Sequence, residues 1–166
     1  AALILAQLEA AAGRTQEAEA LFEAHGPSLQ HATVLLSLGR TQEARIAIDR
    51  TLEARPNAWG PLELRGRLAL HENAFAAAER DLSLAAQVDP THPMTWVYLS
   101  QARGRSGALQ GARDALRRAV EVGLPAPTAE VEQARLDALS GKPNAARARV
   151  AALLRLDPEW AQRLEH

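Results

Sequence analysis

Apolar residues recur at intervals of three or four along most of the chain, in stretches separated by short polar turns. Ala78, Leu82 and Ala85 show this spacing, with Asn73 at the turn before them and Asp89-Pro90 after them. Such spacing places the apolar side chains on one face of an α-helix, and proline ends the helix. No stretch alternates between apolar and polar residues with a period of two. The sequence therefore predicts an all-α protein without strands.

The same pattern, followed from one turn to the next, gives the bounds of each expected helix. The expected helices are 1–12, 15–25, 28–38, 41–54, 58–71, 74–88, 93–106, 108–122, 127–140, 143–156 and 158–164.

Residues of similar chemistry return every 34 positions. The turn column holds Gly39, Asn73, Gly107 and Gly141. The alanine column holds Ala44, Ala78, Ala112 and Ala146. The large apolar column holds Ile48, Leu82, Leu116 and Val150. Small residues allow two helices to approach closely, and the larger residues fill the space between them. Because one helix hairpin cannot bury its apolar face alone, successive hairpins must stack on each other.

The first unit of the array is shorter than the others. The string Gly-Arg-Thr-Gln-Glu-Ala begins at Gly13 and again at Gly39, an interval shorter than the one from Gly39 to Asn73. We expect a shortened second helix in this unit that ends near His25-Gly26-Pro27, because glycine and proline stop helices.

The array resembles the tetratricopeptide repeat family. The residues that carry the resemblance are Trp96-Val-Tyr-Leu99-Ser100, Gly107, Ala112, Leu116 and Ala119 in the fourth unit, and Leu38-Gly39, Ala44 and Pro56 in the second. The resemblance implies a right-handed superhelical solenoid of about five antiparallel helix hairpins and a C-terminal capping helix. The expected repeat domain is 1–163, with units 1–25, 26–57, 58–91, 92–125 and 126–157 and a cap at 158–163; residues 164–166 are interpreted as an expression-tag remnant.

The resemblance also implies that the first helices line a concave groove that binds peptides. The residues that it places there are Leu29, Gln30, Thr33, Leu64, Arg67, Met94, Val97, Tyr98, Gln101, Arg105, Val131 and Arg135. Arginine can grip a carboxylate with two hydrogen bonds, and Tyr98 and Met94 could anchor an apolar side chain. For Met94 and Tyr98, which stand at positions i and i+4, the packed interior is the favoured interpretation and the groove is the alternative.

Composition excludes several classes of site. The 166 residues include no cysteine, which rules out disulfides, iron–sulfur clusters and thiolate chemistry. A net charge of −1 argues against non-specific nucleic-acid binding. His25, His31, His71 and His92 form no i, i+4 metal pair, and His71 is interpreted as a solvated or turn-capping residue. We expect no enzyme activity, no metal and no cofactor. We also expect no membrane insertion, because no run approaches the roughly 18 apolar residues of a span.

Two further groups of residues have a structural interpretation. Arg113, Arg117 and Arg118 fit a solvated outer face, with an Asp114–Arg118 pair, better than a patch for an acidic partner or nucleic acid. Trp59, Trp96 and Trp160 are expected to be packing residues, with Trp160 in the last capping helix.

These features predict a non-catalytic scaffold that binds a peptide or helix of a partner protein. One lysine against eighteen arginines, and a start at Ala1, suggest part of a larger bacterial protein. Two alternatives remain: the regulatory or substrate-recruiting arm of an enzyme such as a kinase or glycosyltransferase, and a self-association module in which the short first unit docks on another copy. A soluble protein is expected, with the cytoplasm favoured over the periplasm.

Overall fold

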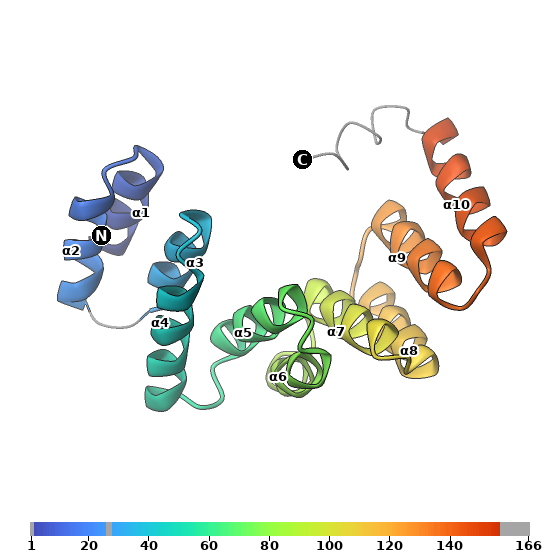
Figure 1. Ribbon diagram of the computed structural model, residues 1–166, viewed down its shortest axis with the longest axis horizontal. Helices are drawn as coiled ribbons and strands as arrows, with labels where there is room; N and C mark the ends of the chain where they lie inside the picture. Colours follow the sequence, from blue (N-terminus) through green and yellow to red (C-terminus); the bar gives the residue numbers. More distant parts are fainter. Residues whose placement is uncertain (1, 26–27, 157–166) are drawn as a thin grey trace. The chain divides into compact units, whose positions relative to one another are not determined.

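The computed structural model describes residues 2–25 and 28–156, and ten α-helices and no strand occur in this part of the chain (Figure 1). They are α1 (Ala2–Ala11), α2 (Thr15–His25), α3 (Leu29–Ser37), α4 (Thr41–Ala54), α5 (Trp59–His71), α6 (Phe75–Val88), α7 (Pro93–Arg105), α8 (Leu109–Glu121), α9 (Ala126–Leu139) and α10 (Pro143–Leu156). Each end lies within one residue of the predicted one. The predicted helix 158–164, with Trp160, lies outside the described residues.

Consecutive helices form antiparallel pairs, such as α1 with α2, α3 with α4, α7 with α8 and α9 with α10. The chain divides into two compact units, Ala1–Arg65 and Gly66–His166, and each is described by itself. In the first unit, Ala6, Ala18 and Phe22 form a buried cluster between α1 and α2, and Val34 of α3 packs against it. The helix α2 has 11 residues against 14 in α4, which confirms the shortened helix expected in the first repeat.

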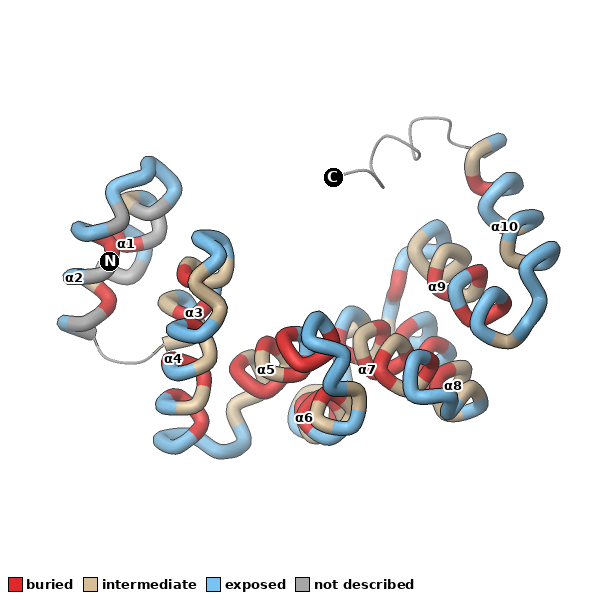
Figure 2. The backbone as a smooth tube through the Cα atoms, in the orientation of Figure 1, coloured by how far each residue is buried: buried red, intermediate tan, exposed pale blue. Residues whose placement is uncertain are grey.

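The second unit holds two connected layers of core, which appear as the buried stretches of α6 to α9 in Figure 2. One cluster joins α5, α6, α7 and α8, and includes Leu82, Leu99 and Ala102. The other joins α7, α8 and α9, and includes Val97 and Leu136. The half-buried Trp96 packs against both clusters, and its Nε1 donates a hydrogen bond to the carbonyl oxygen of Pro90 (2.9 Å), so it is a packing residue as predicted.

The turn column has the backbone conformation that its residue types suggest. Gly107 has φ +88° and Asn73 has φ +60°, in the left-handed region that glycine adopts freely and asparagine tolerates. The Asn73 N–H donates to the Leu70 carbonyl (3.1 Å) and the Ala74 N–H to the Ala69 carbonyl (2.8 Å), which ends α5 and turns the chain into α6. The period of the sequence therefore repeats a backbone turn as well as a packing pattern.

Candidate functional site

A pocket of about 230 Å³ lies between the C-terminal part of α5 and α7, in the second unit. Its lining consists of Arg67, Leu70, His71, Tyr98, Gln101 and Arg105. Four of these, Arg67, Tyr98, Gln101 and Arg105, were assigned to the groove from the sequence. They meet because the repeat places Arg67 and Gln101 in the same position of successive first helices.

Arg67 of α5 and Tyr98 of α7 form a cation–π pair in the lining of the pocket. The guanidinium carbon of Arg67 lies 5.0 Å from the centroid of the Tyr98 ring. A guanidinium stacked on a ring uses its flat face for that contact, and its N–H edge is the part that recognises carboxylates. Tyr98 is half-buried and Arg67 is exposed, so the pair combines an apolar surface with a cation at the mouth of the pocket.

The other cationic wall is held by neighbouring groups. Arg105 lies over the Phe75 ring, 4.8 Å from its centroid. Its Nη2 donates to Asn73 Oδ1 (2.6 Å) and its Nη1 to the Leu70 carbonyl (3.4 Å). His71 is exposed at the end of α5, as predicted for a solvated residue. His71 was not predicted to line the pocket, although it stands one repeat before Arg105 and therefore shares a column with Arg105.

Polar contacts continue from this pocket to α9. Gln101 Nε2 donates to Glu132 Oε1 (3.0 Å), and Arg135 Nε lies 3.3 Å from Glu132 Oε2. Burial raises the pKa of Glu132, against the opposing effects of Arg135 and the Gln101 hydrogen bond. The buried carboxylate therefore fixes Gln101 from behind, while Arg135, which is 49% exposed in its side chain, remains accessible to solvent.

The remaining groove residues predicted from the sequence lie in different surroundings. Leu64 and Val97 are 5% and 1% exposed, so these two side chains belong to the interior. Met94 is 39% exposed and does not lie in the packed interior. In the first unit, Gln30 and Thr33 are exposed, and Leu29 is half-buried.

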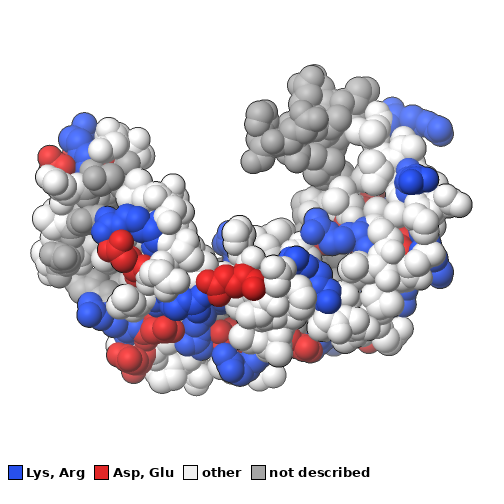
Figure 3. Space-filling model, in the orientation of Figure 1, with Lys and Arg blue, Asp and Glu red and all other residues white. Residues whose placement is uncertain are grey.

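Two of the three arginines, Arg117 and Arg118, lie on the solvated face of α8 that the sequence indicated. The prediction is wrong for Arg113, which is half-buried and whose Nη2 donates to Ser140 Oγ (2.7 Å). Arg117 pairs with Asp114 (2.8 Å), and the side chains of Arg117 and Arg118 are 67% and 65% exposed. The predicted Asp114–Arg118 pair is wrong, because Arg118 Nη1 instead donates to Glu121 Oε2 (2.8 Å). In Figure 3 basic and acidic groups are interspersed over the face in view, which fits a near-neutral chain.

Residues 2–25 and 28–156 contain no group of three or more histidine, aspartate or glutamate side chains placed to hold a metal ion. None of the described helices is both long enough and apolar enough to cross a membrane.

Comparison with solved structures defines the class of fold. The chain matches residues 41 to the end of MamA from Desulfovibrio magneticus RS-1 with a TM-score of 0.77 and 18% identity, over 93% of this chain and 92% of that one. It matches a tetratricopeptide repeat protein from Parabacteroides merdae with a TM-score of 0.76 and 17% identity, over 93% and 63%. Pseudomonas aeruginosa PilF matches with 0.74 and 14%, over 95% and 75%. No protein-family model and no curated protein sequence matches this chain.

The fold is therefore that of the tetratricopeptide repeat proteins, with helices in sequential antiparallel pairs. This confirms the fold class predicted from the period of the sequence.

Proposed function

We propose that this chain is a non-catalytic interaction module that binds an extended or helical segment of a partner protein. The binding surface comprises the α5–α7 pocket, which Gln101 helps to line, and Arg135 of α9. The observation that carries the proposal is the convergence of Arg67, Tyr98, Gln101 and Arg105 on one pocket. Tetratricopeptide repeats generally serve as protein-interaction scaffolds, which supports this assignment.

The chemistry of the lining indicates the kind of segment that fits. Leu70 and Tyr98 provide apolar surface, Arg67 and Arg105 provide cations, and His71 provides an imidazole. Among the described residues, no carboxylate lines this pocket. Its volume of about 230 Å³ is below the range of small-molecule sites, so it suits one or two side chains of a peptide. The preferred ligand is a segment that carries an apolar side chain next to a carboxylate.

Peptides that bind the full chain can be selected from a displayed library of random linear peptides. An enriched peptide then serves as the probe that tests this proposal. Affinity of an enriched peptide is then measured by calorimetry on the parent chain and on Tyr98→Ala and Arg67→Met. We expect each substitution to weaken binding at least about tenfold, as for a central contact of an interface. Arg117→Met, on the solvated face of α8, is the matched control and should bind like the parent.

A second measurement separates binding from folding. Circular dichroism and thermal unfolding must show that the variants are folded. The peptide is also made with its acidic residue replaced by the amide, and a double-mutant cycle should then show coupling between that carboxylate and Arg67. Unchanged affinity in Tyr98→Ala and Arg67→Met, together with a loss in Arg117→Met, would place the binding surface elsewhere.

A further inference from the structure

Successive hairpins of the second unit are joined by one recurring contact. Leu136 of α9 packs into the space between α7 and α8, where Val97, Ala112 and Leu116 receive it. All four side chains are buried, with Leu136 only 2% exposed. This contact has two halves: a leucine on a first helix, and an apolar recess on the hairpin before it.

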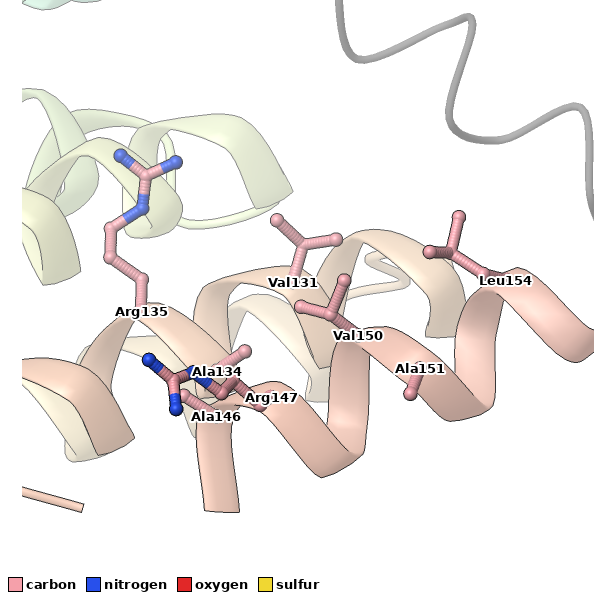
Figure 4. Close-up of a pocket in the computed structure, with 8 residues that line it drawn as sticks. All are labelled: Val131, Ala134, Arg135, Ala146, Arg147, Val150, Ala151 and Leu154. Atoms are coloured by element: carbon pink, nitrogen blue, oxygen red, sulfur yellow. The ribbon is translucent and has the colours of Figure 1, made fainter. Parts of the chain in front are cut away.

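The recess recurs one period later without a helix of the described chain to fill it. Val131, Ala146 and Val150 are the residues one repeat after Val97, Ala112 and Leu116. Together with Leu154 they line an open, mostly apolar pocket of about 550 Å³ between α9 and α10, whose lining also includes Arg135 and Arg147 (Figure 4). We call Val131, Ala146, Val150 and Leu154 the α9–α10 face. Val150 is 36% exposed, whereas its counterpart Leu116 is 4% exposed.

The other half of the contact is exposed on α1. The column that contains Leu136 runs back through Ala102 and Leu68 to Val34, and the shorter interval of the first unit places Leu8 at its start. The later members pack inward: Leu68 is 7% and Ala102 0% exposed, and Val34 packs against the cluster of α1 and α2. Leu8 is 60% exposed.

Leu5 lies one turn earlier on α1. Its column continues through His31, Arg65, Leu99 and Gln133, of which Leu99 alone is apolar, and Leu99 is 1% exposed within the core shared by α5 to α8. Leu5 itself is 47% exposed. We call Leu5 and Leu8 the α1 face.

We propose that the α1 face of one copy of this chain docks into the α9–α10 face of a second copy, so that copies associate head to tail. The chain carries both halves of the contact that joins its own hairpins, and each half lacks a partner helix among the described residues. A second copy supplies the missing half at each end, in the register already used between α9 and the hairpin α7–α8. Because the two faces differ, the contact is heterologous and can add further copies.

Sedimentation of the full chain over a range of concentrations measures the association. We expect the mean mass to rise with concentration. The double substitution Leu5→Glu with Leu8→Glu, and separately Val150→Glu, should each weaken association at least about tenfold, because a charge would be buried in an apolar contact. Ile46→Glu, at a position 53% exposed on α4, is the matched control and should associate like the parent.

Mixing the two defective variants distinguishes this contact from other modes of association. The α1 variant retains its α9–α10 face, and the Val150→Glu variant retains its α1 face. Each should be monomeric alone, and an equimolar mixture should form a dimer that stops at two copies. Circular dichroism checks that the variants are folded, which is expected because all the substituted side chains are exposed.

Four outcomes would overturn the proposal. A parent chain that stays monomeric at every concentration excludes head-to-tail association. Association that appears only after removal of residues 157–166 identifies that segment as the occupant of the α9–α10 face. Association that persists in both variants means that copies meet through another surface. Variants that never form a mixed dimer exclude the pairing of these two faces.

Discussion

At the scale of single residues, the strongest polar contact between α9 and α10 is made by one arginine. Arg149 Nε donates to Asp137 Oδ2 and its Nη1 to Glu130 Oε2, each at 2.8 Å. The hydrogen bond from Arg149 is the main cause of a lowered pKa of Asp137, against the opposing effect of burial. A carboxyl group whose pKa is lower in the folded state stabilises the fold above its unfolded pKa, which is about 3.9. That stabilisation is lost as the pH falls through the lower folded pKa.

Replacing Arg149 with methionine therefore has a pH-dependent effect. At pH 7 we expect the free energy of unfolding to fall by about 1–2 kcal/mol, since hydrogen bonds to charged groups are lost. The difference from the parent should shrink as the pH is lowered through the folded pKa of Asp137, where the carboxyl group is protonated. Denaturant unfolding at several pH values measures this.

Arg147→Met is a suitable control for that measurement. Arg147 is an exposed arginine on the same helix, and no ion pair joins it to another described residue. Its replacement should change the unfolding free energy by less than about 0.5 kcal/mol at every pH. A constant deficit for Arg149→Met down to strongly acidic pH would show that Asp137 is not its energetic partner.

Residues of the candidate site could be predicted where they share a column of the repeat. Columns spaced by one repeat placed Arg67, Gln101 and Arg135 on the same face of successive first helices. The same reasoning placed Val97 on that face, whereas the helix is rotated so that Val97 packs between α8 and α9. Periodicity identifies the residues that share a column, but the rotation of a helix depends on how its neighbours pack.

At the scale of helices, the approach of α5 to α6 depends on one missing side chain. A Cβ atom on Gly66 would lie 2.5 Å from Cγ of Leu82, which is 0% exposed and has no room to move. Gly66 stands one repeat before Ser100, another small residue, and it lets α5 and α6 pack closely in the second unit.

Gly66→Ala should therefore destabilise the protein, although alanine favours helices more than glycine does. We expect a loss of about 1–3 kcal/mol in the free energy of unfolding, typical of overpacking in a core. Gly111→Ala on α8 is the control: the nearest atom to its Cβ would be Cδ of the flexible Arg103 side chain, at 3.2 Å. It should be neutral or stabilise by up to about 1 kcal/mol. Thermal and denaturant unfolding would compare the two, and equal effects would contradict the packing argument.

Helix bounds were predictable to within one residue because the turns that separate the helices carry their own chemistry. Asn73 and Gly107 occupy the left-handed conformation that ends a helix, and Pro93 fits the first turn of α7. The partner of Arg118 was not predictable, because Asp114 and Glu121 both lie within about one helical turn of it and the side-chain rotamer selects between them.

At the scale of the whole molecule, stability in a repeat array comes from contacts between neighbouring hairpins. In the second unit, α7 takes part in both core clusters and has six buried residues. By contrast, α10 packs mainly against α9, and Leu153 is its only buried side chain among those described. Among the described residues, α7 is therefore covered on more sides than α10, the last described helix of this unit.

This difference predicts a gradient of local stability along the second unit. Amide hydrogens of α7 should exchange at least about tenfold more slowly than those of α10, since α10 contributes no residue to either cluster and can open without exposing them. Hydrogen exchange followed by mass spectrometry on the monomer, at low protein concentration, measures both helices in one experiment. Exchange of α10 as slow as that of α7 would mean that a segment of the chain beyond Leu156 covers the α9–α10 face. Slow exchange of α10 that is seen only at high protein concentration would instead indicate that a second copy docks on the α9–α10 face.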